Sequence, residues 1–317
     1  MFAAQTDCSN NQKPPAVRRF ARALRRLPLV ALPLCGLALA VQSYRAVRAF
    51  RSELASFRPR RGPVAAPSDV DGLPPLRSVT FHAADGTTLA GWYLPSRNGA
   101  GVIFTHGSSD DRRGLWPEAR ALAGAGYGAL LFDWPGHGES GGAVSWGFPE
   151  RAALVAALDL LAAQPEVDPG RLGVVGFSMG GYVAAQVAAR DARIKAAVLL
   201  GTPGDLEELT RHEYRHQGRL AQAAGLWAAR YAGMDMLAER AVDVVAAIAP
   251  RRLLIVSGSR DDLVSPDMTH RLFAAAREPK RLWLIEGAGH GHYAQAAGAD
   301  YDRTLRAFLD ESLAPAP

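Results

Sequence analysis

The feature that most limits the possible folds of this 317-residue chain is a repeated alternation of short apolar runs with longer alanine- and leucine-rich segments. Runs such as GVIF, GALLF and LLIV are apolar at consecutive positions, which indicates strands buried on both faces of a sheet. The longer segments between them have helical composition. A mostly parallel sheet with helices on both faces accommodates both patterns.

About eight strands are expected. They cover residues 79–81, 88–94, 102–105, 128–132, 172–176, 197–200, 253–256 and 282–285, and helices are expected over 116–125, 149–163, 180–189, 266–276 and 300–309. The first two strands flank the turn sequence ADGT, which predicts an antiparallel hairpin at the start of the sheet.

The basic charge of the chain belongs to its N-terminal part. The first 61 residues contain twelve Lys and Arg against two acidic residues, whereas the remainder contains 24 basic and 29 acidic residues. A mildly acidic body lacks the basic surface of a nucleic-acid-binding protein, so no nucleic-acid partner is predicted. Both cysteines, Cys8 and Cys35, precede the body, which excludes a Cys nucleophile or a Cys-based zinc site there.

Four segments are predicted along the chain: a basic segment over 1–26, a hydrophobic helix over 27–44, a linker over 45–75 and a globular domain over 76–313. The hydrophobic segment is uncharged over about 18 residues, the short end of what spans a bilayer. A single-pass membrane anchor is the favoured interpretation. A cleaved signal peptide, giving a secreted or periplasmic protein, and a helix packed on the body stay open as alternatives. Six Lys and Arg residues lie within about 20 residues of each end, so the orientation in a membrane is undetermined.

One region interrupts the alternation of strands and helices. Residues 203–249 have helix-like sequence without a strand. In an α/β sheet, an insertion after a strand lies over the carboxyl edge where ligands bind, so a short helical lid is predicted here.

The stretch VVGFSMGGYV places Ser178 between an apolar run and a helical run, with Gly176 and Gly180 two residues before and after it. A sharp turn from strand to helix requires small neighbours at these positions and exposes the serine hydroxyl, which favours Ser178 as a nucleophile. An ordinary helix N-cap is the alternative. Ser140 in GESGG fits the same pattern but lacks the adjoining strand and helix.

A serine nucleophile needs a base and a carboxylate that orients this base. Asp261 and Asp262 follow the strand RLLIVSG, and His290 and His292 follow the strand RLWLIEG. The carboxyl ends of parallel strands lie at one edge, so these loops are expected to meet Ser178.

Taken together, the motifs THGSSDDR, FDWPGHGESGG, GFSMGG, GSRDDLVSP and EGAGHG resemble those of the α/β-hydrolase superfamily, in particular its small membrane-anchored serine hydrolases. The resemblance implies Asp261 as the acid, with Asp262 and Asp205 as alternatives, and His290 as the base. It also implies an oxyanion hole formed by the backbone N–H groups of Ser108 and Met179, supported by the turn at His106 and Gly107. His137 is expected in a structural turn.

The predicted activity is hydrolysis of carboxylic esters, with lipid esters and thioesters included, through an acyl-enzyme intermediate. A small-molecule ester, amphiphilic if the protein is tethered to a membrane, is the expected substrate, and no cofactor or metal is expected. The histidine pair His212 and His216 lacks an acidic third ligand. The alternatives are an acyltransferase or a cofactor-free perhydrolase using the same three residues, and a non-catalytic binding protein on this fold.

Overall fold

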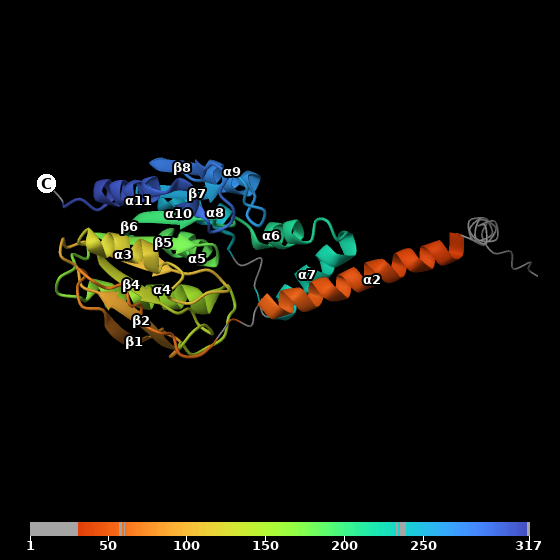
Figure 1. Ribbon diagram of the computed structural model, residues 1–317, viewed down its shortest axis with the longest axis horizontal. Coiled ribbons are helices and arrows are strands. Elements are labelled where there is room, and N and C mark those ends of the chain that lie inside the picture. Colours follow the sequence, from red (N-terminus) through yellow and green to blue (C-terminus); the bar gives the residue numbers. More distant parts are fainter. Residues whose placement is uncertain (1–30, 57–58, 60, 233, 235–238, 316–317) are drawn as a thin grey trace, which may run out of the picture.

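The sheet forms the centre of the main body in the computed structural model, which describes residues 31–56, 59, 61–232, 234 and 239–315. Eight strands lie in the order β1-β2-β4-β3-β5-β6-β7-β8 (Figure 1). Their bounds are β1 Arg77–His82, β2 Thr88–Leu94, β3 Gly101–Thr105, β4 Gly128–Phe132, β5 Leu172–Phe177, β6 Ile194–Leu200, β7 Arg252–Gly258 and β8 Lys280–Ile285. β2 pairs antiparallel with both β1 and β4, and all other pairs are parallel. The predicted sheet and its hairpin are confirmed.

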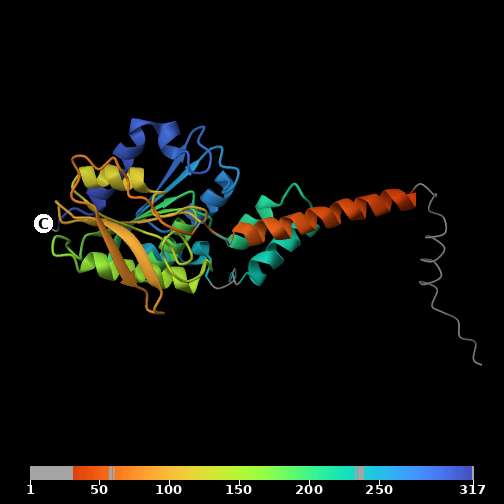
Figure 2. The same ribbon diagram turned by 60° about the horizontal axis from the view of Figure 1, so that its bottom comes forward.

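Helices cover both faces of this sheet (Figure 2). One face carries α4 (Phe148–Ala162), α5 (Met179–Ala188) and α9 (Pro266–Ala275), and the other carries α3 (Trp116–Gly124), α10 (Tyr293–Ala297) and α11 (Ala299–Ser312). Every residue of β3 and β4 is buried, as the consecutive apolar residues of these strands predict.

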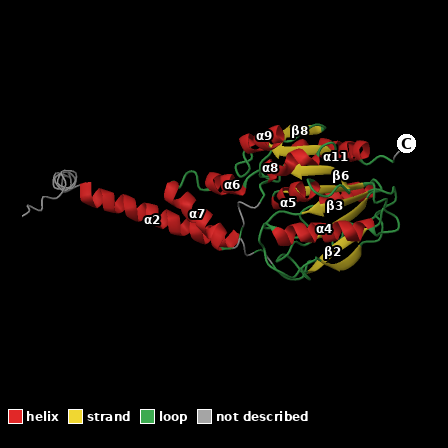
Figure 3. Ribbon diagram, turned by 180° about the vertical axis from the view of Figure 1, so that it is seen from behind, coloured by secondary structure: helices red, strands yellow, loops and turns green. Residues whose placement is uncertain are grey.

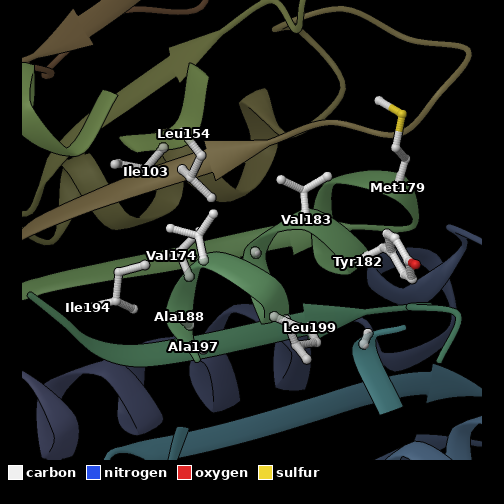
Figure 4. Close-up of a cluster of buried hydrophobic side chains, with 14 of the residues drawn as sticks. Ile103, Leu154, Val174, Met179, Tyr182, Val183, Ala188, Ile194, Ala197 and Leu199 are labelled. Atoms are coloured by element: carbon white, nitrogen blue, oxygen red, sulfur yellow. The ribbon is translucent and has the colours of Figure 1, made fainter. Parts of the chain in front are cut away.

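The core on the α4 and α5 side holds β5 and α5 together (Figure 4). Ile103 and Val174 of the sheet pack with Leu154 of α4 and Val183 of α5, and all four side chains are fully buried. Burial of each such side chain contributes roughly 1.5–3 kcal/mol relative to exposure. This packing therefore fixes both the strand before the turn and the helix after it.

The described residues of 203–249, which exclude 233 and 235–238, form a helical insertion between β6 and β7. It comprises α6 (Leu206–Glu213), α7 (Arg219–Tyr231), α8 (Ala241–Val244) and a 3-10 turn, Val245–Ile248. α6 and α7 project away from the sheet, and α7 lies against the C-terminal half of the long helix α2 (Ala31–Ser56) (Figures 1 and 3). An N-terminal helix and a distant insertion thus lie side by side.

The helix α2 differs from the segments predicted for the N-terminal part of the chain. The predicted linker over 45–75 is wrong for residues 45–56, which continue α2, because Ala49 and Glu53 are buried against the insertion and this packing stabilises the last turns. Of the predicted hydrophobic helix over 27–44, residues 27–30 lie outside the described residues, as does the basic segment 1–26. Within the described ranges, no helix combines the length and the apolar character that crossing a membrane requires.

Candidate active site

The turn after β5 holds Ser178 in a backbone conformation that few non-glycine residues adopt. Its φ is 53° and its ψ is −114°, between the last residue of β5 and the first residue of α5. A Cβ atom on Gly176 would lie 2.6 Å from the carbonyl oxygen of Gly180, and a Cβ atom on Gly180 would lie 2.0 Å from that of Thr105. Only glycine fits at either position. The sequence pattern around Ser178 is therefore a steric requirement of this turn.

Three predicted residues from separate loops meet beside this turn. His290 Nε2 lies 3.1 Å from Ser178 Oγ, and His290 Nδ1 lies 2.8 Å from Asp261 Oδ2. The side chain of Asp261 is fully buried and that of His290 is 20% exposed. The hydroxyl, imidazole and carboxylate thus form one continuous hydrogen-bonded relay, with the histidine reachable from solvent.

The carboxylate of Asp261 is held on both oxygens. Oδ1 accepts hydrogen bonds from the backbone N–H groups of Leu263 (3.0 Å) and Val264 (2.8 Å). Oδ2 accepts from the hydroxyl of Tyr293 at 3.4 Å in addition to facing His290. Burial, the charge of Asp261 and this hydrogen bond raise the pKa of Tyr293, so its hydroxyl remains a donor. The sequence analysis did not identify Tyr293, although it follows the histidine motif directly.

The alternative candidates for the acid, the base and the nucleophile lie outside this relay. Asp205 caps α6 by accepting from the N–H groups of Glu207 and Glu208 and forms an ion pair with Arg240. Asp262 is exposed, and its carbonyl oxygen lies 3.1 Å from His212 Nε2. His292 is exposed and precedes α10. Ser140 is buried, and its hydroxyl donates to the Asp133 carbonyl at 2.7 Å and accepts from the Ala90 N–H.

The loop after β3, predicted to complete an oxyanion hole, is fixed by two buried histidines. His106 Nδ1 donates to the Gly107 carbonyl at 2.7 Å, and His106 Nε2 accepts from the Trp134 N–H at 3.1 Å. Burial lowers the pKa of His106 to about 3, so it remains neutral. His137 Nε2 lies 2.9 Å from the Ser108 carbonyl oxygen. His137 therefore bonds directly to the residue whose N–H was predicted as a donor, a contact that its motif did not indicate.

Close packing around His290 restricts the size of the neighbouring residues. The ring of Phe177 lies 4.8 Å from the His290 ring. A Cβ atom on Gly201, just after β6, would lie 2.3 Å from the Tyr293 hydroxyl and 3.1 Å from His290 Cε1. Gly201 is therefore required where the chain passes beside the histidine.

A cavity of about 90 Å³ opens beside Ser178. Most of its wall is apolar and comes from the helical insertion and two loops: Trp146, Leu206, Leu209, Met234 and Leu263. Ser108 and Ser178 line it on the sheet side, and Thr210, Glu213 and Glu53 of α2 complete it. Sequence analysis offered no signal for Glu53, because its place depends on how α2 packs.

Burial and the neighbouring carboxylate of Glu213 raise the pKa of Glu53 to about 7, against an opposing hydrogen bond from Tyr214. The Tyr214 hydroxyl donates to Glu53 Oε2 at 3.0 Å. For metal binding, the described part of the chain contains no group of three or more ligating side chains in reach of one another. The same holds for the described residues around His212 and His216.

Comparison with known proteins agrees with the fold. A family model described as alpha/beta hydrolase fold matches residues 102–220. The protein Rv2307c of Mycobacterium tuberculosis is 31% identical over 299 residues, covering 92% of this chain and 96% of the relative. The chain belongs to the α/β-hydrolase family.

Two further similarities are more distant, one in sequence and one in structure. YfhR of Escherichia coli K12 is 28% identical over 251 residues, covering 75% of this chain and 82% of the relative. The structure of the Pyrococcus furiosus esterase Pf2001 superposes with a TM-score of 0.70 at 23% identity, covering 81% of this chain and 98% of the esterase. At this level of identity, the likeness to the esterase shows a shared fold.

Proposed function

We propose that the protein is a serine hydrolase that cleaves carboxylic esters through an acyl-enzyme intermediate. The observation that carries the proposal is the relay from Ser178 Oγ through His290 to Asp261, with distances of 3.1 and 2.8 Å. An unassisted serine hydroxyl is a poor nucleophile, and this arrangement is the one that activates it. The structural neighbour Pf2001 is an esterase, which favours an ester as the bond cleaved.

In the proposed reaction, Ser178 Oγ attacks the ester carbonyl carbon while His290 Nε2 accepts the hydroxyl proton. Asp261 holds the imidazole in the required orientation and stabilises its positive charge. The backbone N–H groups of Met179 and Ser108 donate to the oxygen of the tetrahedral intermediate. His290 then returns the proton to the departing alcohol, and water hydrolyses the acyl-enzyme by the same route in reverse.

The helical insertion acts as the lid in this proposal, because Leu206, Leu209 and Met234 line the cavity beside Ser178. A water-poor apolar wall suits an acyl group and strengthens the electrostatic interactions of the oxyanion hole. Attachment to a membrane through residues 27–44 stays a prediction from the sequence, and the proposed chemistry does not depend on it.

The test is Ser178→Ala assayed with p-nitrophenyl acetate and butyrate. We expect turnover to fall by about 10⁴-fold or more, to the level set by binding and the oxyanion hole alone. Labelling by a fluorophosphonate probe should also be lost. Ser140→Ala, in the matching pentapeptide GESGG, is the control and should keep both turnover and labelling. Unchanged hydrolysis by a folded Ser178→Ala protein would refute the proposal.

A further inference from the structure

One residue that lines the cavity beside Ser178 comes from outside both the insertion and the sheet. Glu53 of α2 is only 6% exposed, and it shares the cavity lining with Ser108 and Ser178. Five of the lining residues are apolar, whereas Glu53, Glu213 and Thr210 form a polar part of the wall. An apolar acyl chain attached to Ser178 therefore shares this small cavity with the carboxyl group of Glu53.

Glu53 is held firmly in this place. Tyr214, itself 2% exposed, donates its hydroxyl to Glu53 Oε2 at 3.0 Å and lies 3.2 Å from the Ala49 carbonyl. Ala49 and Ala221 are buried beside Tyr214. Elsewhere in the contact between α2 and α7, the ring of Phe50 lies 5.9 Å from that of Trp227 and 6.3 Å from that of Tyr231. The wall is thus supported by a continuous contact between α2 and the insertion.

The size of the cavity sets the scale of what it holds. A dry cavity of about 150 Å³ accommodates benzene, with six carbon atoms. The cavity beside Ser178, at about 90 Å³, accordingly has room for roughly three or four carbon atoms. A longer acyl chain would have to displace the Glu53 side chain or leave through the mouth.

We propose that Glu53 of the N-terminal helix α2 is a specificity-determining residue that limits the substrates of this hydrolase to esters of short acyl groups. This inference rests on the proposed function. It assigns to α2 a part of the substrate pocket, in addition to any role of the residues that precede it.

The experiment measures kcat/KM for p-nitrophenyl acetate, butyrate, hexanoate and octanoate with the full-length protein. Glu53→Ala removes the carboxyl group and a methylene from the lining of the cavity. Each added methylene that finds room gains roughly fourfold, the equivalent of burying one CH₂ group. We expect the ratio of kcat/KM for octanoate to that for acetate to rise at least tenfold.

Three further variants separate size from other effects. Glu53→Gln keeps the shape of the wall and should keep the wild-type chain-length profile. Arg51→Ala, an exposed position on the same helix, should also leave the profile unchanged. Glu53→Asp shortens the side chain by one methylene and should shift the fall-off toward longer chains by a smaller amount, which provides a reading if Glu53→Ala does not fold.

An active Glu53→Ala or Glu53→Asp protein with the wild-type profile would overturn the inference, and so would a profile that changes equally in Glu53→Gln. These outcomes leave the proposed function intact, because that depends on Ser178→Ala. Hydrolysis that survives in Ser178→Ala would instead remove the proposed function and this inference together.

Discussion

At the scale of single residues, the three candidate carboxylates differ in what surrounds them. Asp261 faces the histidine, Asp205 caps a helix, and Asp262 is exposed. The carboxylate beside the proposed base accepts a hydrogen bond from its imidazole. An amide at the same position stabilises the wrong tautomer of the imidazole. Asp261 is therefore the one of the three whose amide variant should impair turnover severely.

We expect Asp261→Asn to lower kcat for p-nitrophenyl butyrate by about 10³–10⁴-fold. Asp262→Asn and Asp205→Asn should keep kcat within about threefold of the wild type, with a thermal midpoint close to that of the wild type for Asp205→Asn, since asparagine caps a helix about as well as aspartate does. Steady-state kinetics and thermal melts of the three variants provide the check. A larger loss in either control than in Asp261→Asn would contradict the assignment.

In the proposed mechanism His137 acts one step away from the reacting atoms, through its 2.9 Å contact with the Ser108 carbonyl oxygen. Removing an oxyanion donor outright costs about 10²–10³-fold in turnover, and loosening one costs less. We expect His137→Phe to lower kcat by about tenfold with little change in KM. The result that would contradict a positioning role is a pure rise in KM, or an unchanged kcat in a protein that remains folded.

At the scale of secondary-structure elements, the turn between β5 and α5 depends on close backbone packing. Gly180→Ala places a Cβ atom 2.0 Å from the Thr105 carbonyl oxygen, so β3 or α5 has to move. We expect a loss of at least about 2 kcal/mol in the free energy of unfolding, together with a loss of activity.

Gly124→Ala is the matched control for this substitution. Gly124 is the last residue of α3, and the nearest atom to its added Cβ would be 3.9 Å away. Alanine replaces glycine in a helix at a gain of about 0.5–1 kcal/mol. Urea unfolding of both variants measures the difference, and equal effects would show that the contact with Thr105 is unimportant.

The contact between α2 and the insertion makes stability depend on pH. The pKa of Glu53 is about 7 in the folded protein and 4.5 in the unfolded chain, while Glu213 and Tyr214 face it. Between these values the folded protein keeps a proton that the unfolded chain has lost, so stability falls as pH rises through this window and is level above it. The full difference corresponds to about 3 kcal/mol.

Glu53→Gln removes this penalty while keeping an acceptor for Tyr214. From pH 5 to pH 8, the variant should become progressively more stable than the wild type, approaching a difference of about 3 kcal/mol. Urea unfolding at a series of pH values measures it. Parallel pH dependences for the two proteins would show that Glu53 does not titrate differently on folding.

Local sequence patterns were sufficient where local geometry decides the structure. The consecutive apolar residues of GVIF and GALLF predicted buried strands, and the glycines around Ser178 predicted its turn, because each requirement acts within a few residues. The roles of Glu53, His137 and Tyr293 depend on partners 161, 29 and 32 residues away. The last turns of α2 were missed for the same reason, since their burial comes from the insertion.

At the scale of the whole molecule, α2 and α7 project together away from the sheet and the helices that cover it (Figures 1 and 2). The insertion contributes residues such as Leu226 and Ala229 of α7 to the core cluster on the α4 and α5 side of the sheet, whereas Ala49 of α2 packs in a small separate cluster with Tyr214 and Ala221. Loss of α2 should therefore affect the insertion far more than the sheet.

Truncation of residues 1–60 tests this division. We expect the shortened protein to fold with its main thermal transition within a few degrees of the wild type, because the sheet core is untouched. The loss of α2 uncovers Tyr214 and Ala221, which are 2% and 0% exposed in the full chain. Limited proteolysis followed by mass spectrometry should then show cleavage within residues 206–231 well before the wild type is cut there. A truncated protein that resists the protease equally in this segment, or that loses the main transition altogether, would show that α2 and the sheet form one cooperative unit.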